Sequence, residues 1–257
     1  MTAKTLLTAI ALGALLTACT SAREQAMTRQ ARAAERTLER LPTIGDPGRV
    51  AAADIAFARM ARDEGQWTAF RAYAASGAVV HGPGGPVPLE SFINGRANPE
   101  QAIAWTPADI WSSCDGTLAV TFGRLQMPSG DVGSYVTVWE LQSDRSYKWI
   151  YDIGALDNPQ PAPEVDPDLP ENAIIVPGML AINGRIADCP AEGASVPQSP
   201  INITSGAPPE IGEWVADDGT LKVEWRQYAG GTRNVIVEWY RGGEWQIADT
   251  FSVPAGG

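Results

Sequence analysis

Histidine, cysteine and basic side chains are scarce in this chain, and each shortage excludes a class of function. The 257 residues include one histidine and three cysteines, with no Cys-x-x-Cys pair. Structural zinc sites need several such ligands at short spacing, so no metal is expected. Lysine and arginine total 19 against 30 acidic residues, which gives a formal net charge of −11. Because neutralisation of phosphates supplies most of the affinity for nucleic acids, no nucleic-acid partner is expected either.

Common catalytic and cofactor motifs are also missing. The sequence has no Gly-x-Ser-x-Gly nucleophile elbow, no phosphate-binding loop and no Gly-x-Gly-x-x-Gly dinucleotide fingerprint. No cofactor is therefore expected. Glycine and proline are abundant instead, with 26 and 20 residues, and 44% of the chain is hydrophobic. This composition predicts packed cores with many turns rather than a helical bundle.

The N-terminus has the pattern of an export signal. Lys4 precedes the apolar run Leu6–Leu16, which is too short to span a bilayer, so residues 1–18 are predicted to be a signal peptide. The segment Leu16-Thr17-Ala18-Cys19 resembles the lipobox of bacterial lipoproteins. That resemblance implies acylation of Cys19 and membrane attachment through its lipid. The alternative is an ordinary signal peptide followed by an incidental cysteine.

The residue after the lipobox cysteine bears on location. In bacterial lipoproteins an aspartate at this position is the usual mark of retention in the inner membrane, whereas this chain has Thr20. The resemblance therefore implies the periplasmic face of the outer membrane. Export also implies an oxidising compartment, in which Cys114 and Cys189 remain as an even pair once Cys19 is acylated. We expect one disulfide between them; the alternative is two separate buried thiols.

The segment Gly133–Gly154 organises the rest of the chain. Two runs of aromatic and β-branched residues, Tyr135–Leu141 and Tyr147–Ile153, flank a polar turn, which predicts an antiparallel hairpin. Strict alternation gives each strand a face of large side chains: Tyr135, Thr137, Trp139 and Leu141 on the first, and Tyr147, Trp149, Tyr151 and Ile153 on the second. Since the opposite face is also partly apolar, we expect helices on one side and a second sheet, a subunit or a ligand on the other.

The elements before this hairpin carry a family resemblance. Asp46-Pro47 predicts a helix start, Phe57 lies on its apolar face, and Trp67, Phe70 and Tyr73 share one face of a second helix. A short strand over Ala78–His81, the Gly/Pro loop 82–88, a third helix over Leu89–Ile93 and strands over Ala102–Ser112 and Thr117–Gln126 follow.

The order of these elements, with the segment 78–83 and the hairpin 133–154, resembles the nuclear transport factor 2-like (SnoaL-like) superfamily. The resemblance covers residues 46–156. It implies an α+β fold in which a curved antiparallel sheet wraps around N-terminal helices to form a cone with a cavity.

The remaining residues divide into three segments. Residues 19–45 are rich in Ala, Arg and Glu and are predicted to be a solvated helix or tether. Residues 157–177 are rich in proline and acids and are predicted to be a linker. Residues 178–257 are expected to hold a small antiparallel unit of three strands: Leu221–Gln227, Asn234–Tyr240 and Glu244–Asp249.

A short sequence echo links this C-terminal unit to the central domain. Asp115-Gly-Thr-Leu-Ala-Val-Thr-Phe and Asp218-Gly-Thr-Leu-Lys-Val-Glu-Trp agree at five of eight positions. One interpretation is a duplicated three-strand meander. The other is that Asp-Gly turns and Val/Trp strands recur because hairpins require them, and we favour it because turn chemistry alone predicts most of the match.

Three functions are consistent with these patterns. The first is a lipid-anchored envelope protein whose pocket binds a small apolar or aromatic molecule, or a protein partner, without catalysis. The second is an enzyme resembling hydratases, isomerases or cyclases, with His81 and Asp152 as an acid–base pair. The third is a structural module that forms a homodimer through an apolar sheet face. The candidate ligand-binding residues are Trp67, Phe70, His81, Trp111, Tyr135, Trp139 and Tyr151, although such residues are also typical of a core.

Overall fold

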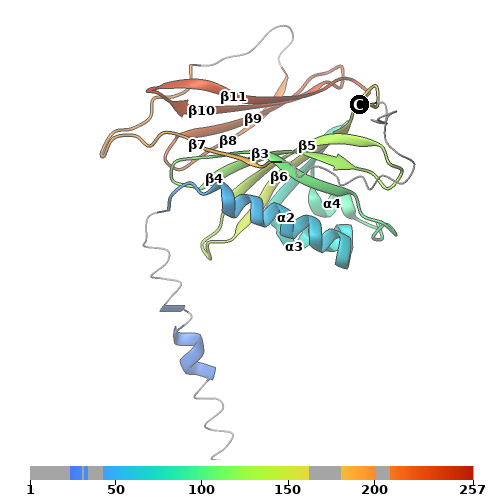
Figure 1. Cartoon of the computed structure of the whole chain (residues 1–257), viewed down its shortest axis with the longest axis horizontal. Coiled ribbons are helices and arrows are strands. Elements are labelled where there is room, and N and C mark those ends of the chain that lie inside the picture. The colour runs from blue at the N-terminus through green and yellow to red at the C-terminus, as the bar shows by residue number, and fades with distance from the viewer. Residues whose placement is uncertain (1–23, 31, 34–42, 162–180, 201–208, 257) are drawn as a thin grey trace, which may run out of the picture. The chain divides into compact units, whose positions relative to one another are not determined.

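The computed structural model describes residues 24–30, 32–33, 43–161, 181–200 and 209–256 (Figure 1). The signal peptide, Cys19 and most of the expected linker therefore lie outside the described residues. Residues 24–30 form an exposed helix, in which the Thr28 hydroxyl donates to the Glu24 carbonyl at 2.9 Å. Within the described ranges, no helix is both long enough and apolar enough to span a membrane.

The main body is α+β, with N-terminal helices, a seven-stranded mixed sheet and a separate four-stranded antiparallel sheet. It spans Thr43–Gln142 and Ser146–Gly257. Its elements in chain order are α2 (Pro47–Glu64), α3 (Gln66–Tyr73), β1 (Ala74–Gly82), β2 (Gly85–Pro88), α4 (Leu89–Ile93), β3 (Ala104–Ser112), β4 (Leu118–Gln126), β5 (Val132–Leu141), β6 (Tyr147–Leu156), β7 (Asn183–Ile186), β8 (Glu210–Val215), β9 (Leu221–Gln227), β10 (Arg233–Arg241) and β11 (Glu244–Val253).

Local chemistry places both long helices where the sequence predicts them. Asp46 caps α2 by accepting from the Arg49 backbone N–H, and Pro47 occupies the first turn, where its missing N–H costs nothing. Gly65 ends α2 with a φ of 107°, a conformation that disfavours other residues, and α3 starts directly after it. The expected Gly/Pro loop over residues 82–88 is wrong in part, because only residues 83–84 form the turn and β2 (Gly85–Pro88) pairs with β1 at the sheet edge.

The seven strands have the order β2-β1-β6-β5-β4-β3-β7. Strands β3 to β6 form an antiparallel meander, whereas β1 pairs in parallel with β6, and β7 pairs in parallel with β3. The helices cover one face of this sheet, and the four-stranded sheet of order β11-β10-β9-β8 covers the other (Figure 1). The C-terminal unit thus has four strands and not the expected three. The additional strand is β8, in which the exposed Ile211, Glu213 and Val215 alternate with the half-buried Gly212 and Trp214.

One expectation about the β5–β6 hairpin is wrong. Val138 pairs with Tyr151 but Trp139 pairs with Trp149, so Ile150 is an extra residue in β6. Because one inserted residue moves all later side chains to the opposite face, Tyr147 and Trp149 face the helices, while Tyr151 and Ile153 face the second sheet. The four large side chains of β6 therefore do not share a face.

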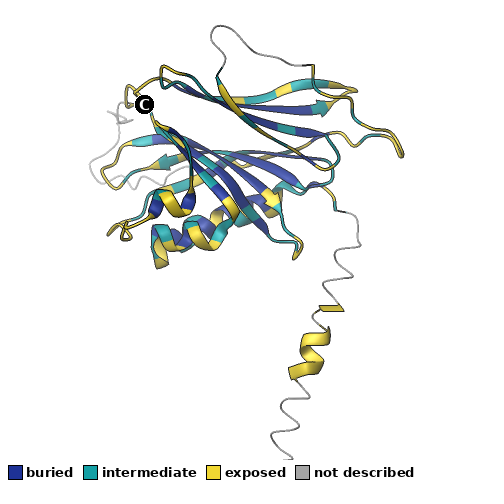
Figure 2. Cartoon of the chain, turned by 180° about the vertical axis from the view of Figure 1, so that it is seen from behind, coloured by how far each residue is buried: buried dark blue, intermediate teal, exposed yellow. Residues whose placement is uncertain are grey.

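Two hydrophobic cores lie on opposite sides of the seven-stranded sheet. The core between the sheets contains Val136, Val138 and Ile153 together with Leu221, Val223 and Trp239. The core under the helices contains Val50, Phe57, Ala61, Trp139 and Trp149. Figure 2 shows buried residues along the strands and on the sheet-facing sides of the helices. The sheet face considered for a homodimer is therefore covered by the same chain.

The C-terminal sheet and the β3–β6 meander share the geometry of one turn and the position of one bulge. The backbone N–H of Asp115 donates to Asp218 Oδ2 at 2.8 Å, and the backbone N–H of Asp218 donates to Asp115 Oδ2 at 3.0 Å. Each turn then continues identically, because the Thr117 and Thr220 N–H groups donate to the Oδ1 atoms of their own turn aspartates. The bulge after Val138 has an equivalent after Val237. The shared turn bonds agree with both interpretations, duplication and recurrent turn chemistry, and the matching bulge adds one feature beyond the turn.

A disulfide joins Cys114 and Cys189, with their Cα atoms 5.1 Å apart. It is the pair expected from the sequence. Cys114 lies between β3 and β4, and Cys189 follows β7, whose next residue Ala187 donates its N–H to the Ser112 carbonyl. The bond thus links the segment after the expected linker to the central sheet.

Candidate functional site

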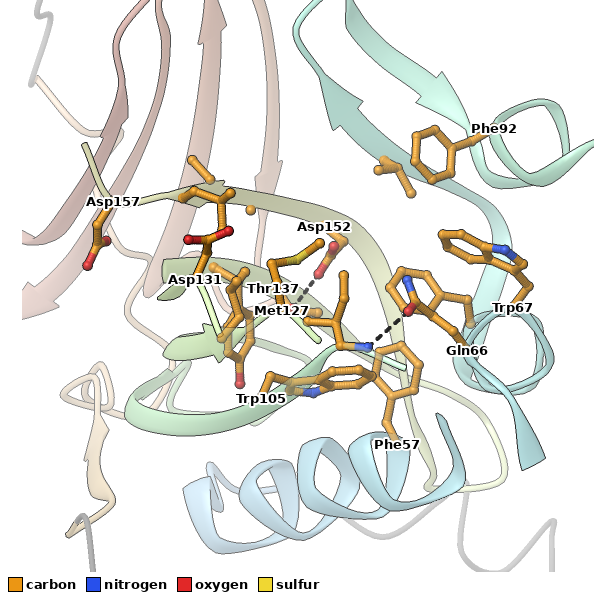
Figure 3. Close-up of a pocket in the computed structure, with 18 of the residues that line it drawn as sticks. Phe57, Gln66, Trp67, Phe92, Trp105, Met127, Asp131, Thr137, Asp152 and Asp157 are labelled. Carbon is orange, nitrogen blue, oxygen red and sulfur yellow. Dashed lines mark hydrogen bonds between the residues drawn. The ribbon is translucent and has the colours of Figure 1, made fainter. Parts of the chain in front are cut away.

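A cavity of about 660 Å³ lies on the helix-covered side of the seven-stranded sheet (Figure 3). Its walls come from α2, α3, α4 and strands β1, β3, β4, β5 and β6. Six aromatic side chains line it: Phe57, Trp67, Phe70, Phe92, Trp105 and Tyr135. Several of these rings meet edge to face; the Phe57 and Trp105 centroids, for example, are 4.7 Å apart. The site is therefore a mainly aromatic chamber.

Asp152 supplies a carboxylate to the chamber. It lies opposite Thr137 in the β5–β6 ladder, and the Thr137 hydroxyl donates to Asp152 Oδ1 at 2.7 Å (Figure 3). Burial raises the pKa of Asp152 to about 6, against the opposing effect of the bond from Thr137. At neutral pH this group is predominantly an anion held in a low-polarity wall.

A second carboxylate, Asp54, lies behind the aromatic wall. Its side chain on α2 is fully buried and accepts from the Tyr135 hydroxyl and from Trp105 Nε1, each at 2.9 Å. Burial raises its pKa to about 7, and the charge of Asp152 contributes to the rise, while the two hydrogen bonds oppose it. Burial followed by the Asp54 charge also raises the pKa of Tyr135. Asp54 thus fixes two rings of the wall.

Gln66 adds an amide to the chamber at the start of α3. Its Oε1 accepts from the Ile103 backbone N–H at 3.1 Å, so its amide nitrogen is the end left for an occupant (Figure 3). The Trp67 indole N–H is already engaged, because it donates to the Ala97 carbonyl at 3.0 Å. Few hydrogen-bond donors are therefore available to a molecule inside.

Two further carboxylates, Asp131 and Asp157, lie at the end of the chamber away from Trp67 and Phe92 (Figure 3). Asp157 is paired with Arg124, whose Nη1 donates to its Oδ1 at 3.1 Å, and this bond lowers the pKa of Asp157. No lysine, arginine or histidine occurs among the described lining residues. The chamber therefore carries negative charge along its length.

His81 lies on the opposite face of the sheet from Asp152. Val80, which precedes it, pairs with Asp152 and lines the cavity, so His81 points into the core between the sheets. Its Nδ1 lies 2.7 Å from the Tyr151 hydroxyl and its Nε2 lies 2.9 Å from Gln227 Oε1. Because a side-chain carbonyl only accepts, Nε2 carries the proton and Nδ1 accepts from the tyrosine. The expected His81–Asp152 acid–base pair is not formed.

The environment of His81 favours its neutral form. The imidazole is buried, and this burial lowers its pKa; the nearby positive charge of Arg233 acts in the same direction, while the bond to Gln227 opposes it. Arg233 also donates to the His81 carbonyl at 3.2 Å. His81 therefore links the two sheets through hydrogen bonds and does not reach the cavity.

The other candidate residues divide between the cavity and the cores. Trp67, Phe70 and Tyr135 line the cavity, as expected. Trp111 packs edge to face on Trp239 between the sheets, with centroids 4.6 Å apart, and Tyr151 is bonded to His81 in the same layer. Trp139 is fully buried under the helices, where its N–H donates to Thr121. These three and His81 do not line the cavity.

Asp54 and Gln66 were not identified from the sequence. The spacing of Asp54 could have identified it. It follows Val50 by four residues and precedes Phe57 by three, so its carboxylate lies in the apolar stripe of α2. A charged residue in such a stripe indicates a buried partner. Gln66 gives no comparable signal, since a polar residue in the first turn of a helix is common.

Within the described ranges, no three His, Cys, Asp or Glu side chains gather in a group that could hold a metal ion. Comparisons with protein-family models and with curated proteins find no match for the chain.

Proposed function

We propose that this chain is a lipid-anchored protein of the cell envelope whose domain over residues 46–156 binds a small molecule without converting it. The observation that carries the proposal is the aromatic chamber of about 660 Å³. This volume lies within the range of about 300–1,000 Å³ that is typical of small-molecule sites. The combination of apolar walls with few polar groups is also typical of such sites. A flat apolar or aromatic body suits the six rings.

The hydrogen-bond pattern favours binding over catalysis. An acid–base pair of the kind expected from the sequence would need a second titrating group within hydrogen-bond reach of the substrate that Asp152 contacts. The Tyr135 hydroxyl and the Trp105 indole N–H are both turned to Asp54, and His81 lies on the other side of the sheet. Asp152 therefore faces the chamber with Thr137 as its bonded side chain, and the open Gln66 amide offers a hydrogen-bond donor that does not titrate.

The order of elements supports membership of the nuclear transport factor 2-like superfamily. The elements follow the order that the resemblance implies: two helices, a short hairpin, a third helix and a four-strand meander. A cavity lies between the helices and the sheet. A homodimer through the second face of this sheet is less well supported, because β8–β11 cover that face.

The membrane anchor forms the second part of the proposal. The motif Leu16–Cys19 supports acylation of Cys19 and attachment at the periplasmic face of the outer membrane. In cell fractionation, the full chain should then occur with the membrane and the Cys19→Ser variant should not. Recovery of both proteins in the membrane fraction would contradict the anchor.

The binding proposal can be tested with N-phenyl-1-naphthylamine, a neutral fluorescent probe whose emission increases in apolar surroundings. Gly154 lines the cavity, and a side chain added there would meet the movable Leu125 Cδ2 at 3.1 Å, so Gly154→Leu should fill part of the chamber. The matched control is Gly230→Leu in the exposed β9–β10 turn, where an added Cβ meets nothing within 4 Å.

The expected result is saturable binding of one probe per chain by the natural protein and by Gly230→Leu. Gly154→Leu should bind about tenfold more weakly or worse, since the loss of a contact area worth about 1.4 kcal/mol produces that change. Equal binding by all three proteins would show that the probe binds elsewhere and would contradict the proposal.

A further inference from the structure

We infer that the occupant of the chamber is an organic cation: a protonated amine on an apolar or aromatic body, with its ammonium group against Asp152. This inference rests on the proposed binding function and adds the chemical class of the ligand. It depends on three observations: the charge of the lining, the open side of the Asp152 carboxylate and the aromatic walls.

The charge of the lining is one-sided. Its ionisable groups with a formal charge are Asp131, Asp152 and Asp157, and among the described lining residues there is no cation to offset them. Arg124 compensates Asp157 from outside the lining. Asp152 has no such partner among the described residues. An anionic ligand would be repelled, whereas a cation would be attracted.

The hydrogen bonds of Asp152 leave one side of the carboxylate open. Thr137 donates to Oδ1, and among the described residues no donor is bonded to the other oxygen. Asp152 is half-buried with its open side toward the cavity, as Figure 3 shows. A buried carboxylate without a charged partner is costly, so a group that brings both a positive charge and N–H donors would satisfy it.

The walls suit a cation for a separate reason. The faces of aromatic rings carry partial negative charge and attract ammonium groups, most strongly when water is excluded. Phe57, Trp105 and Tyr135 line the same chamber as Asp152. The two indole N–H groups of the wall, the positive edges that would favour an anion, are engaged by Asp54 and by the Ala97 carbonyl. Both wall and carboxylate thus favour the same class of ligand.

Three naphthalene derivatives of nearly equal shape separate charge from hydrophobicity. These are 2-naphthylmethylamine, which is a cation at pH 7, the neutral 2-naphthylmethanol and the anionic 2-naphthoate. Titration calorimetry on the full chain should give the amine an affinity about 10- to 100-fold above that of the alcohol, as expected for a hydrogen bond to a charged group. The anion should bind more weakly than the alcohol.

Two variants locate the effect. Asp152→Asn keeps an oxygen that accepts from Thr137 but removes the charge. The affinity of this variant for the amine should fall to that for the alcohol, while its affinity for the alcohol should be unchanged. Asp63→Asn removes the same charge from the exposed side of α2 and should leave all three affinities unchanged. Alcohol binding also shows that the Asp152→Asn variant is folded.

The pH dependence in the natural protein gives an independent readout. Amine affinity should rise between pH 5 and 7, as Asp152 ionises with a pKa of about 6, and alcohol affinity should not change. If the alcohol binds as tightly as the amine, the cation inference fails and the proposed function stands. If neither these compounds nor N-phenyl-1-naphthylamine bind, the proposed function itself fails.

Discussion

Neighbouring residues of β5 enter two different environments on either side of one sheet. Val136 and Val138 are fully buried against the C-terminal sheet, whereas Tyr135 and Thr137 line the cavity under the helices. We call these the sealed face and the hollow face. Both faces are apolar in composition, so hydrophobicity alone does not explain why one is filled and the other is not.

The covering layers account for the difference. On the sealed face a second meander of the same kind lies over the first, and its aliphatic side chains Leu221, Val223 and Val237 interdigitate with those of β4 and β5. On the hollow face the cover is helical, and large rigid rings contact one another at their edges. Trp139 and Trp149 are fully buried under the helices, and the cavity lies beside them.

One polar side chain from each face, His81 and Asp152, shows a related difference. On the sealed face both ring nitrogens of His81 are bonded within the protein. On the hollow face Asp152 keeps one oxygen toward the cavity. A polar group that is satisfied internally holds the fold together, while one that is left open can serve a ligand. The comparison therefore assigns His81 to stability and supports Asp152 as a binding group.

The largest expected effect contrasts two tryptophans, one on each face. Trp239→Ala removes a nearly buried ring that packs on Trp111, and we expect unfolding to cost about 3–5 kcal/mol less. Trp67→Ala removes a ring that borders the cavity. The free energy of unfolding should fall by only about 1–2 kcal/mol, because that side chain is half-buried. Urea unfolding followed by circular dichroism measures both. Equal losses would mean that the faces are packed alike.

A smaller effect is expected from the carboxylate behind the hollow face. The pKa of Asp54 is about 7 in the folded protein against an ordinary value of 3.8. The folded state therefore binds more protons than the unfolded state between these values, and stability should fall as the pH rises from 5 to 8. Asp54→Asn should remove about 2–3 kcal/mol of this fall. The Asn oxygen can still accept from Trp105, and its amide can donate to Tyr135, whose hydroxyl can turn to accept.

The measurement compares urea unfolding of the natural protein and Asp54→Asn at pH 5 and pH 8. Asp63→Asn, on the exposed side of the same helix, is the control and should retain the full pH dependence. If Asp54→Asn keeps the same fall in stability, Asp54 is ionised in the folded state throughout, and the chamber has a more polar wall than we describe.

The sequence was sufficient for features that depend on neighbouring residues. Asp46-Pro47 predicts the start of α2, Gly65 predicts its end, and the polar turn before Tyr147 predicts the β5–β6 hairpin. Trp67, Phe70 and Tyr135 were also placed correctly, because the helix and strand periods aim them at one interior. These features follow from local propensity and spacing.

Features that depend on distant contacts could not be predicted in this way. The extra residue at Ile150 is invisible in a run of aromatic and β-branched residues, yet it moves Tyr151 to the sealed face. The position of His81 likewise depends on Gln227, which lies 146 residues away in the chain. The likeness between the two meanders gives only five matching positions in the sequence, since packing constrains the type of strand residues more than their identity.

The smallest expected effect concerns His81 on the sealed face, and its sign is opposite to that of Asp54. Burial lowers the His81 pKa below its ordinary value of 6.5, so below that pH the unfolded state binds more protons than the folded state. The contribution of His81 to stability is thus present at neutral pH and is lost on acidification. His81→Phe keeps the ring contacts with Tyr151 and Trp225 and removes the loss of stability on acidification. At pH 7.5 it should lower the free energy of unfolding by about 1–3 kcal/mol, because the hydrogen bonds of the imidazole are lost.

Tyr151→Phe is the matched control, because it removes one partner of the imidazole and leaves the titrating group in place. Urea unfolding at pH 7.5 and pH 5.5 should then show acid destabilisation in the Asp54→Asn/Asp152→Asn background and in its Tyr151→Phe derivative, but not in its His81→Phe derivative. The double background is used because burial raises the folded pKa values of both Asp54 and Asp152, and each contributes a pH dependence of opposite sign to that of His81. Acid destabilisation that persists without His81 would assign the sensitivity to another group of the sealed face, and the opposition between the two faces would no longer rest on this histidine.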